Sequence, residues 1–371
     1  MPSSLDALVE QAEVTRVLNI CNACRYCEGY CAVFPAMFRR LQFDANDVDY
    51  LANLCHQCGA CLHACQYAPP HEFAVNIPRI LARARVQTWS DHAWPQVLAR
   101  LYRRNGLVLS LALAAMLASF LALVMGSTGS LWAVPDGGFY ALVSHEVMVG
   151  LFAPVFLWAI VALTIGVIRF WRSNPPGPLS AAAMREATTD VLSLKYLGGG
   201  HGDGCNNRDD AFGLARRRFH HATFYGFLLC FGATSVATLY HYVGGLPAPY
   251  GFTSVPKILG MSGGTLLVVG TVGLFWLNLT RHPLQGAPER KPMDLGFIAL
   301  LWLTAASGLA LAVVGRLTAL PLLLALHLGA VMALFATMPY SKFAHGIYRS
   351  AALLRWAVEK RRPSEVRLAG D

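Results

Sequence analysis

The stretches CNACRYCEGYC (residues 21–31) and CHQCGACLHAC (residues 55–65) carry the same cysteine spacing. In each stretch two residues separate each of the first three cysteines from the next, and three residues separate the third cysteine from the fourth. This spacing is typical of [4Fe–4S] clusters, because three thiolates on a tight loop can bind three iron corners while a more distant cysteine binds the fourth. The repeated pattern therefore predicts two [4Fe–4S] clusters close together.

The fourth cysteine of each run in two-cluster ferredoxins binds the cluster of the other run. The sequence therefore predicts two thiol sets. The first thiol set is Cys21, Cys24, Cys27 and Cys65, and the second thiol set is Cys55, Cys58, Cys61 and Cys31. Structural zinc is the alternative, although zinc sites usually join two separate knuckles instead of three cysteines in seven residues. Disulfides are disfavoured because MPSSLDALVEQAEV, at the N-terminus, has no signal-peptide pattern.

Composition indicates a membrane protein. Of 371 residues, 55% are hydrophobic and 14% charged, whereas a soluble protein carries about 25% charged residues. Six apolar segments of about 20 residues are each long enough to cross a bilayer as a helix. They are Leu107–Met125, Val147–Ile168, Phe219–Val243, Ile258–Thr280, Leu295–Gly315 and Leu317–Tyr340. The net charge of +9 gathers at the ends of these segments, which disfavours nucleic acid as a partner.

The predicted fold class is all-α, because the segments between and after the cysteine runs also read as helices. An N-terminal α-helical two-cluster ferredoxin domain (1–105) is followed by a six-helix transmembrane bundle (106–345), with a connecting loop at 172–218 and a C-terminal tail at 346–371. Arg103, Arg104, Arg169 and Arg172 lie on one side of the bundle, and Arg316 is among the few basic residues on the other. The positive-inside rule then places both termini in the cytoplasm, in the inner (cytoplasmic) membrane.

Histidines near the ends of the apolar segments predict haem b. His327 and His345 are 18 residues apart, so a continuous helix would place them on one face about 27 Å apart. An antiparallel neighbour carries His220, His221 and His241 at similar depths. This arrangement pairs His241 with His327, and His220 or His221 with His345, and it suits one or two bis-histidine haems.

Other interpretations of these polar residues remain open. His145 is an alternative outer partner, and terminal histidines also occur at headgroup level without binding a cofactor. Tyr340, Ser341 and Lys342 are candidates to bind a quinone or a haem propionate. A lysine at this depth can instead extend to the membrane surface.

The stretch HLGAVMALFATMPYSKFAH (327–345) resembles the haem-ligating helix of respiratory nitrate reductase gamma subunits and of their heterodisulfide reductase relatives. The whole chain, including LKYLGGGHGDGCN (194–206) and RRRFHHATFYGFLLCFGATSVATLYHY (216–242), resembles the tricarballylate-utilisation protein B, or CitB-type, family. The resemblance implies a membrane iron–sulfur and haem b subunit that oxidises a partner flavoprotein.

That partner would be a cytoplasmic FAD-dependent dehydrogenase of the tricarballylate type. We expect the electrons to pass on to a quinone among the membrane lipid. Nothing in the sequence suggests a flavin site on this chain, so substrate oxidation is expected to occur on the partner. The alternatives are a heterodisulfide-reductase-like subunit, and a haem-free membrane anchor or redox sensor that carries the ferredoxin domain. A transporter is disfavoured because the apolar segments contain few carboxylates.

Overall fold

The computed structural model describes residues 4–102, 106–132, 139–173, 175–199, 202–314, 318–364 and 366. Within these ranges most of the chain is helical, and the only strands among them form one short antiparallel ladder. The predicted all-α fold class is therefore confirmed. The predicted domain boundary at residue 105 lies outside the described residues.

The N-terminal part is a set of short helices joined by the cysteine-rich turns. Its helices are α1 (Ser4–Cys24), α2 (Val33–Met37), α3 (Ala45–Leu54), α4 (Ala60–His63), α5 (Ile77–His92) and α6 (Gln96–Tyr102). Side-chain caps fix two of the starts: Asp44 accepts from the Asp47 N–H at 2.7 Å, and Asn76 accepts from the Arg79 N–H at 3.0 Å. Such caps satisfy backbone donors that have no partner inside the helix.

Six longer apolar helices follow, with the short helix α8 (Phe139–Leu142) between the first two. They are α7 (Gly106–Thr128), α9 (His145–Ser173), α11 (Ala215–Tyr242), α12 (Val255–Leu279), α13 (Lys291–Val314) and α14 (Leu320–Thr337). Five of them, α9 and α11 to α14, are long and apolar enough to cross a membrane, and α7 contains a shorter apolar stretch. Each predicted apolar segment thus corresponds to one helix.

The predicted continuous helix through His345 is wrong. Helix α14 ends at Thr337, and a separate helix, α15 (Ala344–Glu359), begins after six intervening residues. Pro339 explains the break, since its ring blocks the helical path and it has no N–H to donate. The intervening backbone forms tight turns, such as the bond from the Tyr340 N–H to the Thr337 carbonyl at 3.0 Å.

The connection between α9 and α11 folds onto the rest of the chain. It contains α10 (Ala181–Leu192), the 3₁₀ turn η1 (Lys195–Gly198) and the strands β1 (Cys205–Asn206) and β2 (Phe212–Gly213); a second 3₁₀ turn, η2 (Pro288–Arg290), precedes α13. Helix α10 packs its alanines against α15, and Glu186 of α10 pairs with Arg361 at 2.6 Å. Most of the predicted C-terminal tail is therefore a packed helix.

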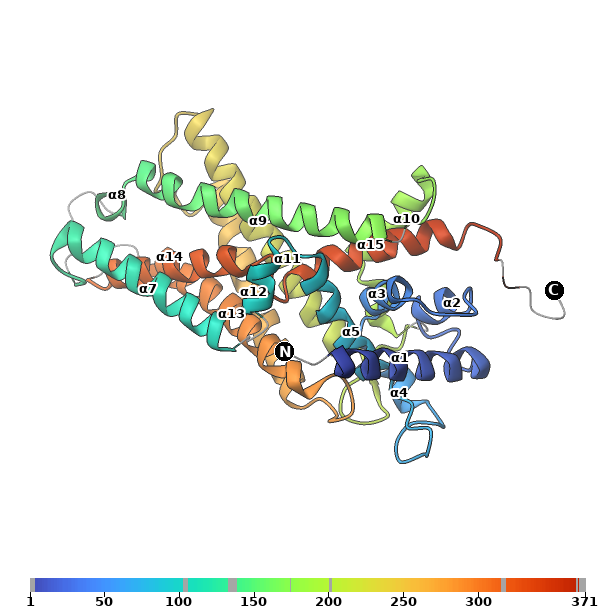
Figure 1. The fold of residues 1–371 in the computed structure, drawn as a ribbon. Coiled ribbons are helices and arrows are strands. Elements are labelled where there is room, and N and C mark those ends of the chain that lie inside the picture. Colours follow the sequence, from blue (N-terminus) through green and yellow to red (C-terminus); the bar gives the residue numbers. More distant parts are fainter. Residues whose placement is uncertain are drawn as a thin grey trace.

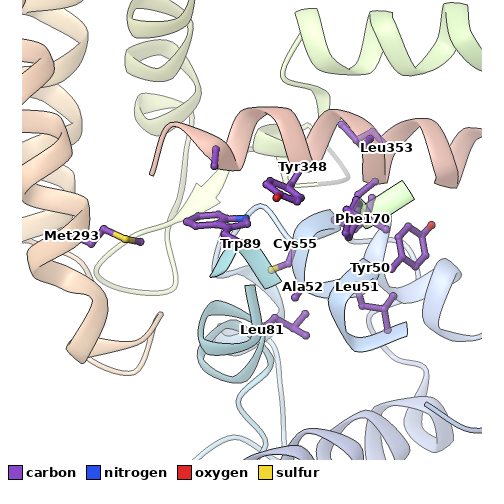
Figure 2. Packing of buried hydrophobic residues seen from close by; sticks show 14 of the residues in the cluster. Tyr50, Leu51, Ala52, Cys55, Leu81, Trp89, Phe170, Met293, Tyr348 and Leu353 are labelled. Atoms are coloured by element: carbon purple, nitrogen blue, oxygen red, sulfur yellow. The ribbon is translucent and has the colours of Figure 1, made fainter. Parts of the chain in front are cut away.

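The N-terminal helices gather at one end of the apolar helices (Figure 1). Helix α15 runs on from the end of α14 and crosses into this region, with α9 alongside both. Figure 2 shows Tyr348 and Leu353 of α15 beside Tyr50 and Leu51 of α3, in one buried cluster that also contains Cys55. The ferredoxin-like part and the membrane helices thus share a hydrophobic core, which fixes their relative position.

Close packing of α11 on α12 depends on glycine. A Cβ at Gly226 would lie 2.7 Å from the Leu267 backbone nitrogen and 2.8 Å from the Gly263 carbonyl oxygen, whereas a Cβ at Gly232 would meet nothing closer than 3.9 Å. Small residues at such contacts let membrane helices approach one another.

We therefore expect Gly226→Ala to lower the free energy of unfolding by about 1–3 kcal/mol, since overpacking displaces the facing backbone. Gly232→Ala, on the same helix, is the control and should leave stability unchanged or slightly raised. Thermal unfolding of the detergent-solubilised protein measures both. Equal stability of the two variants would contradict the assignment of Gly226 to a close helix contact.

Candidate metal centres

The first thiol set lines one cavity of about 230 Å³ near the surface. Cys21 and Cys24 lie in the last turn of α1, and Cys27 lies in the turn that follows. Cys65, which belongs to the other cysteine run, completes the set directly after α4. Cys24 is exposed, so this cavity opens to solvent. The spatial grouping is the one that crossed ligation requires, while ligation itself stays a prediction.

The second thiol set lines a separate, smaller cavity of about 10 Å³. Cys55 and Cys58 are buried, and Cys31 reaches this cavity from the first cysteine run. Gln57 adopts a left-handed conformation with φ of 53°, which turns its N–H toward the Cys55 sulfur at 3.4 Å. An N–H directed at a sulfur is a feature that stabilises a bound thiolate.

The chemistry of both sets fits a metal cluster. Burial and the neighbouring thiols raise the pKa of Cys27 to about 12 and hold the pKa of Cys31 well above its usual range. Thiolates are the metal-binding form, so four of them can share such a site only where cations offset their charge. The iron of a bound cluster would supply that charge.

Sulfur spacing also bears on the zinc alternative. No three His, Cys, Asp or Glu side chains in the described parts of the chain converge as a single metal ion requires. A tetrahedral zinc site would place its sulfurs about 3.8 Å apart. A cubane binds each thiolate through a different iron, so its thiolate sulfurs lie farther apart. The preference for clusters over zinc therefore stays a prediction from the cysteine spacing.

His220 of α11 and His345 of α15 face one another. Their ring centres are 6.0 Å apart, with the ring planes at 65°. A metal–imidazole bond of about 2 Å on each side of one iron would place two ring centres about 6 Å apart. The His345 Nδ1 contacts the Lys342 carbonyl, and such a contact orients the other ring nitrogen toward a metal. These two residues could hold a haem iron.

The remaining histidines do not form the predicted outer pair. His241 stacks on His145 with ring centres 3.9 Å apart, which is too close for iron between them. His327 Nδ1 instead lies 3.1 Å from the Ser307 hydroxyl on α13, and His221 Nε2 lies 3.1 Å from the Ser193 carbonyl oxygen. The pairing of His241 with His327 fails because α11 packs along α12 and not along α14.

The three residues considered for quinone or propionate binding all have partners inside the protein. Lys342 Nζ lies 2.5 Å from a carboxylate oxygen of the buried Asp294, so it does not extend to the membrane surface. The Tyr340 hydroxyl donates to the Trp94 carbonyl at 3.0 Å, and the Ser341 hydroxyl accepts from the Phe343 N–H. Their contacts indicate a structural role at the turn between α14 and α15.

Two arginines that the sequence analysis did not single out hold the second cysteine run. Arg216 lies one helical turn before His220 on α11 and donates to the Gln57 carbonyl. Arg349 lies one turn after His345 on α15 and donates to the Cys55 carbonyl at 2.8 Å. Residues four apart share a helix face, so this spacing is the signal that could have identified them. Both histidine-bearing helices therefore contact the second run.

The polar connection after α10 covers the same region. Cys205 is buried beside Cys58, and its thiol donates to the Leu197 carbonyl at 3.3 Å. His63 Nδ1 lies 2.9 Å from a carboxylate oxygen of Asp210. The described residues of this connection, among them Leu197 and Cys205, thus shield Cys58 of the second thiol set from water.

Comparisons with known proteins find the same family along nearly the whole chain. The family described as Citrate utilization protein B matches residues 99–365, and the Citrate utilization protein B Fer4-like domain matches residues 14–93. Citrate utilization protein B of Escherichia coli is 57% identical over 364 residues, covering 97% of this chain and 96% of the relative. No solved structure matches.

Proposed function

This chain belongs to the citrate utilization protein B family, and from that membership we propose that it is a membrane electron-transfer subunit in the use of citrate or tricarballylate. Its task would be to reoxidise a cytoplasmic FAD-dependent dehydrogenase and to pass the electrons to a quinone. When bound, the two [4Fe–4S] clusters and haem b would carry single electrons between a two-electron flavin and the membrane acceptor. Substrate oxidation would occur on the partner.

One observation carries this proposal: the second thiol set and the His220–His345 pair lie against the same two helices. Arg349 contacts Cys55 and follows His345 by a single turn. A redox group held by the thiols and one held by the histidines would then be neighbours. That adjacency is expected of a relay, and a ferredoxin domain tethered to an inert anchor does not require it.

The difference in solvent exposure between the two thiol sets indicates the direction of electron transfer. Cys24 is exposed and the neighbouring Tyr26 is 67% exposed, so a flavoprotein can approach the first thiol set. The second thiol set is covered by the loop and by α15. We infer that electrons enter at the first set, continue through the second, and leave toward the membrane helices.

The distribution of charge supports a location in the inner membrane with both termini in the cytoplasm. Arg169, Arg172 and Arg281 lie at the ends of apolar helices on the side of the ferredoxin domain. Arg103, Arg104 and Arg316, which belong to the same argument, lie outside the described residues. The domain that a soluble flavoprotein must reach would then face the cytoplasm.

The alternative functions are less well supported. A heterodisulfide-reductase-like subunit would share the membrane fold, but the catalytic cysteine motifs of that enzyme are absent from this sequence. A haem-free anchor or redox sensor has no need for two half-buried histidines whose ring centres are 6.0 Å apart. We therefore propose one haem b, held by His220 and His345.

An optical spectrum of the purified protein tests the proposal. We expect dithionite to produce a b-type α-band and a broad bleaching of iron–sulfur absorption, and we expect a soluble quinone to reverse both. About eight non-haem irons per chain would accompany this result, since two cubanes hold four each. Bleaching without an α-band would favour the haem-free anchor, and reduced protein that quinone does not oxidise would exclude quinone as the acceptor.

A further inference from the structure

Two arginines, the buried Arg85 and the half-buried Arg349, donate to one carbonyl of the second cysteine run. Arg85 of α5 is 5% exposed, and its Nη1 donates to the Cys55 carbonyl at 2.7 Å. Arg349 of α15 donates to the same oxygen at 2.8 Å. In the described parts of the chain neither guanidinium forms an ion pair with a carboxylate, and the Arg349 Nε has no hydrogen-bond partner. Their positive charge therefore lacks a protein counter-charge.

Buried charges in proteins are normally paired with an opposite charge. Arg216 adds a third positive charge to the same turn by donating to the Gln57 carbonyl. Its other terminal nitrogen lies 3.3 Å from the side-chain oxygen of Asn207, which is neutral. Three arginines thus surround this loop. The carboxylate that acts on Arg85, Asp294, is itself paired with Lys342, so the thiolates of the second set would be the nearest unpaired anions in the described parts of the chain.

The first thiol set has a different environment. Arg25 is in the lining of its cavity, but this side chain is half-buried, and its guanidinium lies over the Phe38 ring, 5.0 Å from the ring centre. Cys24 of this set is exposed to water. Solvent screens charges at such a site far more than it screens buried ones. The second thiol set therefore has three arginines on its loop, one of them buried, whereas the cavity of the first set is lined by the half-buried Arg25.

This difference matters for reduction. A cubane with four thiolates is anionic, and reduction adds one further negative charge, so nearby buried cations stabilise the reduced form more than the oxidised form. Net charge, hydrogen bonding and solvent exposure are the properties that set the potential of an iron–sulfur cluster. A guanidinium that donates to the backbone carbonyl of a cysteine ligand would lie close to the cluster, so its charge would act at short range.

We propose that Arg85, Arg349 and Arg216 make the second thiol set the higher-potential of the two cluster sites. Electrons accepted at the exposed first set would then be drawn toward the membrane helices. The inference rests on the proposed function, since it takes both thiol sets to bind [4Fe–4S] clusters. It deepens that function by assigning to three residues the direction of electron flow.

A redox titration followed by electron paramagnetic resonance on the full-length protein in detergent tests this. In Arg349→Gln and in Arg85→Gln we expect one of the two cluster potentials to fall and the other to stay unchanged. The expected shift is at least about tenfold in the electron equilibrium between the clusters, or about 59 mV for a one-electron couple. Arg349→Lys should keep the potential close to the wild-type value, because lysine preserves the positive charge.

Arg83→Gln is the matched control. Arg83 lies on α5, two residues before Arg85, but it is exposed and pairs with Glu289 at 2.5 Å. We expect its loss to leave both potentials unchanged. If Arg83→Gln shifts the same potential as strongly as Arg85→Gln, the effect is not specific to the buried cations.

The possible outcomes distinguish a failure of this inference from a failure of the proposed function. Full iron content with unshifted potentials in both glutamine variants, or an equal fall of both potentials, would overturn the inference alone. Wild-type protein without [4Fe–4S] clusters would overturn the proposed function as well. If a glutamine variant fails to hold iron, the Arg349→Lys variant is used to test the inference. A role that depends on charge predicts a near-normal cluster potential in this variant, whereas a role that depends on the hydrogen bonds of the guanidinium alone does not.

Discussion

Replacing Cys21, Cys24 and Cys65 together by alanine is expected to remove one iron–sulfur cluster and to leave the other intact. These residues line the same cavity, although Cys65 comes from the second cysteine run. The iron content should fall from about eight to about four atoms per chain, and the spectrum of the remaining [4Fe–4S] cluster should be unchanged.

A second variant makes this prediction specific to crossed ligation. Replacing Cys21, Cys24 and Cys31 removes the first cluster and also deprives the second of one thiolate, since Cys31 lines the other cavity. We expect less than about four irons per chain and an altered or missing signal from the remaining centre. If the two variants show the opposite behaviour, each cysteine run binds its own cluster and the crossed assignment is wrong.

Cys205→Ala is the control for both variants. Cys205 is a buried cysteine that contacts Cys58 but lies in neither thiol set. We expect this variant to keep about eight irons. Loss of iron from it would mean that the loop between α10 and α11 supplies a ligand.

The sequence predicted those features that depend on local spacing. Cysteine spacing grouped Cys31 with the second run and Cys65 with the first, and the structure brings these residues together in the same way. Apolar length located the membrane helices, because hydrocarbon thickness sets a minimum number of residues. Helix length is encoded within one run of residues, and the crossed grouping follows from the pattern common to two-cluster ferredoxins, so both can be identified without knowledge of the tertiary fold.

Features that depend on contacts between distant segments were not predicted. The periodicity of residues 327–345 suggested one helix, but Pro339 divides it, and His345 belongs to a different helix from His327. Arg349 lies beside Cys55 only because α15 packs on α3 and α5. No local pattern in the sequence specifies that packing.

Replacing His345 by alanine is expected to remove haem b from the protein. His345 and His220 face each other across a gap of a length that suits one iron between two imidazoles. The two histidines would together hold the haem iron, so the loss of either would leave it with a single protein donor. We therefore expect the α-band of the reduced protein to disappear and the haem content to fall from about one per chain to near zero. His220→Ala should have the same effect.

Two further variants show whether this loss is specific. His221→Ala is the matched control because His221 is adjacent to His220 but contacts the Ser193 carbonyl, so haem should be retained. His327→Ala separates the observed arrangement from the one that helical periodicity suggested. Because His327 contacts Ser307 and not another histidine, we expect its replacement to leave the haem content unchanged. Loss of haem in His327→Ala with retention in His345→Ala would show that the functional haem lies deeper in the bundle, and that the His220–His345 pair has another role.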